Sequence, residues 1–497
     1  MKKFLTTLAA IVLLPNTTLA ADNISLTLNE AIGLALKNNR TIEQSAEDRE
    51  AARWNLSVAR RNSGLVLNWS SAFNKIGGRY YRITYRNAHD AYNFRKNYPQ
   101  DFGDINMNFY PNYDYENNNN FSLRMNLYTG GRLENQMESA RYSLNSADLI
   151  LENSRQTVKY QAAAAYYQVL QRASMVNVQE EALELLQEHL RTVSIQYEVG
   201  TVAKSDMLST SVQLANTKQA LNSARGNYKT AVAQLNNVLG LPVDTEIAAT
   251  DKKEFSKYTL TENDCLDYAL AHRPDGIAAV YQVKRAEADA KSAKAGYRPN
   301  VAAVIRGDFI GEKLFQANHT QERYTIGLEM NWNIFDNGVT SAQVHQYQAA
   351  KRKAESVANQ QIETIQLEVH SAYINLKTAE ENIDTLAAAV ADAEEEFEIA
   401  KIRYIEGVDT NLNVMTAQEK VVETRNNYYT ALYTYYTSLA QLEKAMGVPV
   451  TIDARIYADA VNEGKSANKS LEAATVAQSY LDDDAWEMPS PFENAEP

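Results

Sequence analysis

The chain repeats its own pattern after 207 residues, and this duplication limits what it can fold into more than any other feature. Three pairs of glycines keep that spacing: Gly131 and Gly338, Gly200 and Gly407, Gly240 and Gly447. Their neighbours agree as well, since 197–200 matches 404–407 and 239–243 matches 446–450. Equal spacings with matched neighbours indicate a tandem repeat. Each half is therefore expected to build the same succession of elements.

Each repeat is predicted to open with a capped helix and to continue with two strands. Thr27 with Glu30, and Thr261 with Asp264, place an acid three residues after a hydroxyl, which is the pattern of a capping box. Apolar and polar residues then alternate in four segments: 65–73, 121–128, 301–310 and 324–334. Strands with one apolar and one polar face suit a membrane barrel with a wet lumen. A half-buried sheet of a soluble protein is the alternative.

A helix of about 65 residues is predicted after each strand pair, over 132–197 and 339–404, and would reach roughly 100 Å. In the second helix, apolar residues keep a spacing of four and three from Ile365 to Tyr404, which predicts a coiled-coil seam. The first helix holds a heptad from Met137 to Ala165. A step of four then leads to a predicted continuation at Val169, Val176, Leu183 and Leu190. Such a step locally unwinds a supercoil. A return helix follows each turn.

The first twenty residues have the layout of a cleaved secretory signal, with Lys2 and Lys3 before an apolar stretch and Ala20 at its end. No later stretch approaches the roughly 20 apolar residues of a membrane helix. Any membrane contact would therefore be made by strands. Four strands do not close a barrel, because the smallest known has about eight. The chain must then oligomerise, and two, three or four copies would all give a permitted barrel.

Composition argues against several functions. The 62 acidic residues outnumber the 49 basic ones, which is unfavourable for a nucleic-acid partner. The six histidines and the single Cys265 show no ligand spacing, so neither a metal site nor an intrachain disulfide is predicted. Phosphate-binding loops and nucleophile elbows are also missing from the sequence. We therefore predict no catalytic residue and no cofactor.

The predicted division of the chain has five parts: a signal peptide at 1–20, a first repeat at 21–243, a linker at 244–259, a second repeat at 260–450, and a polar, acidic tail at 451–497. The first repeat carries an insertion, 74–120, that is rich in tyrosines with arginines interspersed. Long loops of outer-membrane barrels lie outside the cell, where this one would cover the pore or contact anionic glycans. An accessory hairpin without a partner is the alternative.

Taken together, these features resemble the TolC-type outer-membrane efflux protein family over about residues 26–450. The most specific segments are 26–32, the strand-to-helix junctions 128–132 and 334–338, and the helix tips around Gly200 and Gly407. The resemblance implies a mainly α protein with membrane β structure. A homotrimer would form a twelve-stranded transmembrane β-barrel in the outer membrane, continued by a coiled-coil α-helical barrel through the periplasm.

The same resemblance implies partners: an inner-membrane transporter and a periplasmic adaptor that touches the helix turns at the tunnel mouth. The adaptor-docking residues would be Val199, Gly200, Thr201, Glu406, Gly407 and Val408. As a plain structural alternative, both glycines are helix caps, since glycine adopts positive φ at little cost.

The resemblance also places a periplasmic gate near these turns. By position, Ser205, Asp206 and Tyr404 would restrain the closed mouth. Asp409 stands where the family has an arginine, so an arginine-centred latch does not carry over. Asn413 and Thr416 stand where TolC-type proteins have two aspartates at the narrowest ring, so cation binding there does not carry over either.

Acidic residues at the tips also have a plainer reading, as solvated charges at helix ends. Gathered around a threefold axis, however, they would form an acidic mouth that attracts cations. The expected function is passive export through the outer membrane, of small molecules or, by a type I route, of proteins. A periplasmic coiled-coil adaptor or scaffold is the alternative from another class.

Overall fold

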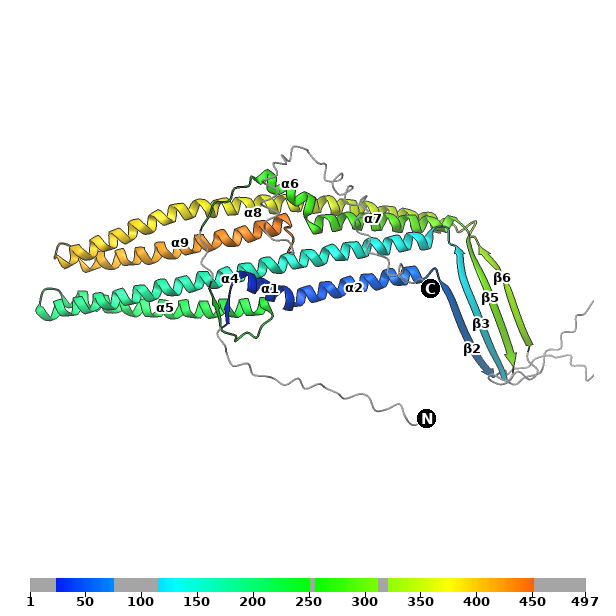
Figure 1. The fold of residues 1–497 in the computed structure, drawn as a ribbon, viewed down its shortest axis with the longest axis horizontal. Coiled ribbons are helices and arrows are strands. Elements are labelled where there is room, and N and C mark those ends of the chain that lie inside the picture. The colour runs from blue at the N-terminus through cyan, green and yellow to red at the C-terminus, as the bar shows by residue number, and fades with distance from the viewer. Residues whose placement is uncertain (1–23, 76–114, 251–254, 312–320, 451–497) are drawn as a thin grey trace, which may run out of the picture. The chain divides into compact units, whose positions relative to one another are not determined.

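A computed structural model of the chain describes residues 24–75, 115–250, 255–311 and 321–450 (Figure 1). The predicted signal peptide, the tail 451–497 and most of the insertion 74–120 lie outside the described residues. The chain divides into two compact units. The helical unit contains the described residues within 1–53, 142–284 and 352–497, and the strand-bearing unit contains those within 54–141 and 285–351.

The two halves build the same elements in the same order, apart from one short 3-10 helix. The first half contains β1 (Ile24–Leu26), α1 (Leu28–Asn38), α2 (Arg40–Arg61), β2 (Leu65–Lys75), β3 (Tyr115–Tyr128), α4 (Arg132–Val199) and α5 (Lys204–Leu239). The second contains β4 (Ile247–Ala249), α6 (Glu262–His272), α7 (Pro274–Lys294), the 3-10 helix η1 (Ala295–Tyr297), β5 (Asn300–Gly311), β6 (Gln321–Asn331), α8 (Val339–Ile405) and α9 (Asn411–Met446). The tandem repeat is confirmed, while the predicted domain boundaries stay a prediction.

Both repeats open with the capping box that the sequence predicts. The Thr27 hydroxyl accepts from the amide of Glu30, and the Glu30 carboxylate accepts from Thr27 in return. Thr261 and Asp264 repeat the arrangement. The opening segment is nevertheless two helices in each half, which was not predicted. In the second half Pro274 starts α7, because proline suits a first helical turn and holds the preceding Arg273 extended.

The strand-bearing unit is a four-stranded antiparallel sheet in the order β2-β3-β5-β6. Its register aligns the apolar residues of neighbouring strands on one face: Trp69 lies opposite Phe121 and stacks on it with ring centroids 5.9 Å apart. Ile326 and Leu328 on that face are more than 70% exposed in the single chain. On the other face Arg124 and Arg306 both contact Glu329. The sheet therefore separates an apolar from a polar surface, as predicted.

The last predicted strand is too long by three residues. β6 ends at Asn331, whereas alternation predicted a strand through Ile334. The indole Nε1 of Trp332 donates to the main-chain oxygen of Tyr297, 3.1 Å away. This bond directs Trp332 towards Tyr297, which lies just before β5, and the chain then turns towards α8.

Seam residues form the core of the helical unit. In α8 the predicted positions from Ile365 to Tyr404 are buried, except that Leu386 and Val390 are partly buried. In α4 the prediction after Val169 is wrong: the buried residues are Val178, Ala182, Leu186 and Val193, while Val176, Leu183 and Leu190 are only partly buried. The spacing of a two-helix seam does not hold in this part of α4 because α9 packs against it as well. The Gln418 side chain of α9 donates to the main-chain oxygen of Ala182.

Within the described residues, no helix combines the length and the apolar character needed to cross a bilayer.

Candidate gate at the helix turns

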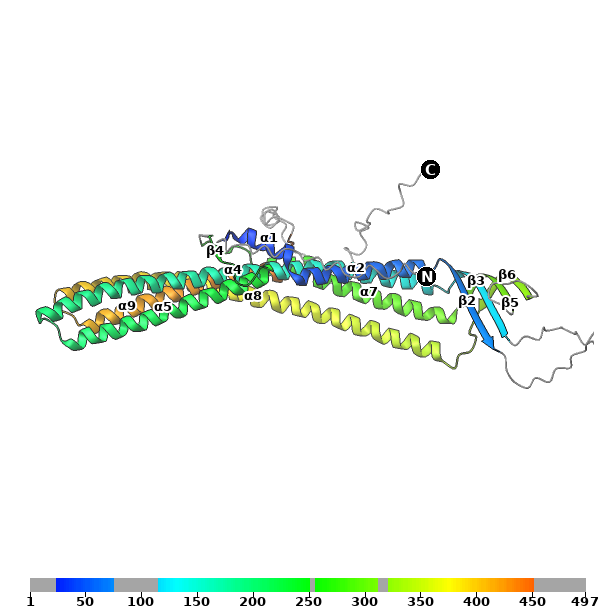
Figure 2. The ribbon, with the colours of Figure 1, turned by 90° about the horizontal axis from the view of Figure 1, so that it is seen from below.

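Two helical hairpins form the candidate site: α4 with α5, called the first hairpin, and α8 with α9, called the second. Their turns lie at the same end of the helical unit (Figures 1 and 2). Gly200 and Gly407 adopt φ values of 82° and 76°. The amides of Thr201 and Val408 each bond a carbonyl five residues back, at 2.9 Å. Both turns are thus helix C-caps of the same glycine-dependent type.

All six residues predicted to dock an adaptor are exposed: Val199, Gly200, Thr201, Glu406, Gly407 and Val408. Two of them are apolar side chains directed at solvent, since Val199 is 74% and Val408 69% exposed. Apolar side chains exposed at a turn are available for contact with another protein. The adaptor-docking role stays a prediction.

Tyr404 lies at the contact between the two hairpins but does not bond Asp206. Its ring is buried, and its hydroxyl donates to Oε1 of Gln196 on α4 at 2.8 Å. Burial, followed by the nearby Asp206 carboxylate, raises the pKa of Tyr404. Its counterpart in the first repeat, Tyr197, is 38% exposed. Only the second repeat therefore uses this tyrosine to join the hairpins.

Asn411 connects three helices and was not predicted. Its side chain is buried at the start of α9, where Oδ1 accepts from Nε2 of His189 on α4 at 2.7 Å. Its Nδ2 donates to the main-chain oxygen of Asp206 at 3.2 Å and to the hydroxyl of Thr210 at 2.9 Å, both on α5. We call these contacts the Asn411 latch. Asp206 thus contributes its backbone to the latch, whereas the prediction rested on its carboxylate.

Among the residues that the structure describes, His189 is the one titratable side chain that bonds Asn411 directly. Its ring meets the Tyr404 ring edge to face, with centroids 5.3 Å apart. Burial lowers the pKa of His189; the bond with Asn411 opposes this, and the charge of Lys401 adds to it. An apolar cluster surrounds the latch, comprising Val193, Phe397, Tyr404, Val414 and their neighbours, with Val202 and Met207 against it. Packing and hydrogen bonds therefore hold the same contact between hairpins.

Of the remaining predicted gate residues, Asp409, Asn413 and Thr416 lie on the second hairpin and Ser205 on the first. The Asn413 side chain and the Thr410 amide donate to the Asp409 carboxylate, and with nearby Arg403 they lower the pKa of Asp409. Arg403 Nε lies 3.7 Å from Asp409 Oδ2, so an arginine does form an ion pair at this turn. This arginine precedes Gly407 in the chain and does not occupy position 409.

Thr416 is exposed and donates to the Leu412 carbonyl, and Ser205 is exposed on α5. Among the residues that the structure describes, no cluster of histidine, cysteine or acidic side chains could hold a metal ion. The structure thus brings Tyr404 and the Asp206 backbone to one contact, while Ser205, Asn413 and Thr416 stay at the surface.

The comparison with family models gives one match, to "Outer membrane efflux protein", over residues 31–241 and 265–448. The two matched segments correspond to the two repeats. Together they cover most of the chain.

Curated relatives agree with this match. The outer membrane efflux protein BepC of Brucella suis is 25% identical over 63% of this chain and 68% of its own length. TolC of Escherichia coli is 22% identical over 68% of this chain and 72% of its own length. The alkaline protease secretion protein AprF of Pseudomonas aeruginosa is 20% identical over 92% of each chain.

Solved structures share the fold. The CmeC outer membrane channel of Campylobacter jejuni superposes with a TM-score of 0.71 at 16% identity, over 87% of this chain and 88% of its own. VceC of Vibrio cholerae superposes with a TM-score of 0.69 at 16% identity, over 84% and 96%.

Proposed function

Because this chain belongs to the outer membrane efflux protein family, we propose that contacts between its two hairpins close an export passage, which opens when the hairpins separate. The chain is an exit channel of the outer membrane and not an enzyme. As a homotrimer it conducts substrates passively to the exterior, on delivery by a periplasmic adaptor and an inner-membrane transporter. Four strands per chain give the trimer twelve, and the helices form the periplasmic tunnel.

The observation that carries the gate proposal is the Asn411 latch. A buried amide that bonds both helices of the other hairpin has its hydrogen-bonding capacity filled only while the hairpins touch. Separation would expose these groups to water, which replaces their bonds at modest net cost. A contact of this kind can hold a closed state and still release it.

Adaptor docking at the turns is tested by placing a carboxylate on them. Val199→Asp with Val408→Asp should abolish crosslinking to the adaptor and export in cells, because a charge replaces two exposed apolar contacts. Val357→Asp, at a side chain of α8 that is 51% exposed and distant from the turn in sequence, is the matched control. Normal export by the turn variant, with crosslinking intact, would contradict the docking assignment.

Export of proteins is a second candidate cargo function. Its support is the match to AprF, a protease secretion protein, which extends over 92% of both chains. Deleting this chain's gene and analysing both secreted proteins and dye retention distinguishes the two kinds of cargo.

The gate is expected to loosen in acid. The pKa of folded His189 lies below its ordinary value of 6.5, so the latch has its full stability above that pH. It loses stability as the pH falls below 6.5 and through the lower folded value, because the ring then gains a buried charge near Lys401. Single-channel recording from pH 7.5 to 5 should show a rising open fraction.

His189→Gln is the control for this prediction, since glutamine retains a donor for Asn411 and does not titrate. It should remove the part of the pH response with a midpoint below 6.5. A pH response that is identical in His189→Gln and wild type would contradict the role of His189.

A further inference from the structure

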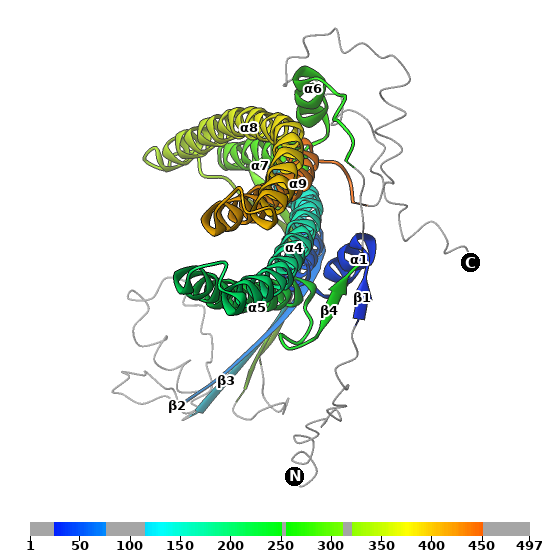
Figure 3. The same ribbon diagram turned by 90° about the vertical axis from the view of Figure 1, so that its left-hand side faces the viewer.

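One face of the helical unit is covered by short elements: β1, α1, β4 and α6 lie along α4, α8 and α9 on the same side (Figure 3). Four tyrosine hydroxyls mark the covered face, each donating to a main-chain oxygen of the covering segments: Tyr166 to Leu26, Tyr228 to Ile247, Tyr373 to Leu260 and Tyr435 to Ser256. These four are equivalent pairs of the 207-residue repeat. Both halves therefore present the same side to the covering elements.

A groove of about 790 Å³ lies on another side of the same helices and is lined by α4, α5, α8 and α9. Gln168, Asn375 and Thr437 line it, and each lies two residues after one of those tyrosines. Two residues turn a side chain about 200° around a helix. On α4, α8 and α9 the groove thus occupies the side that faces away from the covering elements.

This groove has an unusual chemistry for a chain in which 22% of residues are charged. Its described lining contains only amide, hydroxyl, aromatic and small apolar side chains, with tyrosines at 160, 167 and 433. A second groove, of about 470 Å³, lies between α4, α5 and α9, nearer to the helix turns. Its lining is again mostly Gln, Asn and Thr, with Glu419 and Glu423 as its charged members. We call the larger groove, whose lining carries no charged side chain, the neutral strip.

Equivalent positions of the two repeats contribute uncharged polar side chains to the neutral strip. Three equivalent pairs line the larger groove: Gln168 with Asn375, Gln171 with Thr378, and Gln234 with Gln441. In each pair both members are polar and uncharged. An amide or hydroxyl at a solvent-exposed helix position is readily replaced by Lys or Glu without loss of helix stability. Retention in both halves indicates a requirement on the wall itself.

We propose that the neutral strip is the cargo-contacting wall of the passage and takes uncharged, polyhydroxylated cargo, the chemistry of an oligosaccharide. The inference rests on the proposed export function and adds a substrate class to it. Side-chain amides both donate and accept hydrogen bonds, as sugar hydroxyls do, and tyrosine rings offer apolar surface to the faces of sugar rings. Such bonds exchange with water at small net cost, so cargo is held only briefly. A wall without fixed charge also does not retain ions.

The test uses the purified oligomer in planar bilayers with maltoheptaose as the neutral probe. We expect brief current blockades whose frequency rises with probe concentration. Gln168→Leu with Asn375→Leu removes two amides per chain and should shorten the blockades about threefold or more. Gln219→Leu, at an exposed glutamine of α5 that lines neither groove, should leave them unchanged.

A second pair of variants tests the position of the strip independently of the probe. Gln168→Glu with Asn375→Asp should shift the reversal potential in a salt gradient towards cation selectivity. No shift would mean that the strip does not line the passage, which overturns the inference. Channels that maltoheptaose does not block overturn it too, and a neutral unfolded peptide that blocks instead would assign the wall to polypeptide. Absence of any channel would contradict the export function itself.

Discussion

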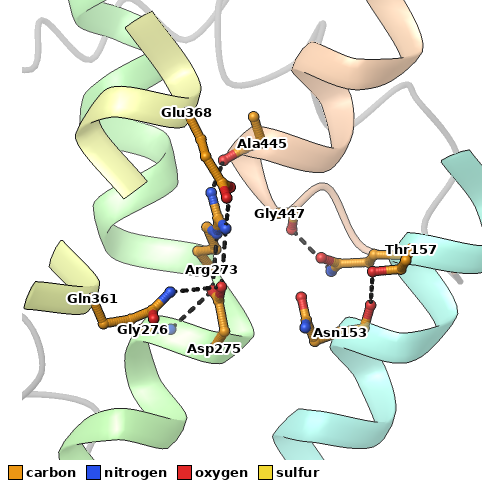
Figure 4. Close-up of polar contacts among 10 residues, drawn as sticks. Asn153, Thr157, Arg273, Asp275, Gly276, Gln361, Glu368, Ala445 and Gly447 are labelled. Carbon is orange, nitrogen blue, oxygen red and sulfur yellow. Dashed lines mark hydrogen bonds and ion pairs between the residues drawn. The ribbon is translucent and has the colours of Figure 1, made fainter. Parts of the chain in front are cut away.

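Arg273→Ala is expected to destabilise the helical unit by about 3–5 kcal/mol, because it leaves carboxylates near a buried site without their counterion. Figure 4 shows the Arg273 side chain pointing towards Glu368 and Ala445. This side chain is only 4% exposed. Its Nε lies 2.9 Å from Asp275, its Nη2 lies 2.5 Å from Glu368, and its Nη1 donates to the Ala445 carbonyl at 3.1 Å. One guanidinium therefore joins the start of α7, the middle of α8 and the end of α9.

Thermal unfolding of the detergent-solubilised protein measures this effect, with Arg225→Ala as the matched control. Arg225 pairs with Glu180 at 2.6 Å, but both side chains are about half exposed, so its loss should cost at most about 1 kcal/mol. Arg273→Lys keeps the charge and loses the planar fork, which predicts an intermediate value. Equal stability of Arg273→Ala and Arg225→Ala would contradict the role of Arg273 as the junction between these helices.

Asn411→Leu is expected to open the resting channel. The substitution removes the side-chain hydrogen bonds of Asn411 to the first hairpin at nearly constant volume, and the three shortest of them are together worth about 3 kcal/mol. Each 1.4 kcal/mol changes an equilibrium tenfold, so the open-to-closed ratio should rise about a hundredfold. Tyr404→Phe loses only the bond to Gln196 and should have a smaller effect. Single-channel open probability is the measurement.

Two further variants separate the latch from the carboxylate model of the gate. Asp206→Ala keeps the main-chain oxygen that Asn411 uses, so it should open the channel much less than Asn411→Leu. Asn413→Ala alters only a surface contact within the second hairpin and is the control. If Asp206→Ala opened the channel as strongly as Asn411→Leu, the carboxylate and not the latch would hold the gate.

The sequence alone was sufficient for the repeat, the caps, the strand faces and the α8 seam, because each depends on local periodicity. The α4 seam from Val176 onward was predicted wrongly, since a third helix enters there and periodicity describes contact with only one neighbour. The break between α6 and α7 was not predicted, although Pro274 disfavours helical geometry in the residue before it.

The gate residues stay a prediction, and the contacts that join the two hairpins were not predicted from the sequence. Tyr404 lies at the contact between the hairpins, and the partner of its hydroxyl is Gln196. Asn411 and His189 were missed because each looks ordinary within its own helix, and only the packing of two hairpins brings them together. One signal was available: Asn411 corresponds to Lys204 in the first repeat, so the halves differ at the latch. Differences between repeats are where an asymmetric function is to be sought.

The most direct test of the central claim is single-channel recording from the purified mature protein in planar bilayers, with its oligomer mass measured on the same sample. A trimer that inserts and gives discrete openings, rare in wild type and frequent in Asn411→Leu, is the predicted result. An elongated soluble species that does not insert, and that alkali washes from cell membranes, would contradict the account of an outer-membrane channel closed at its helix turns.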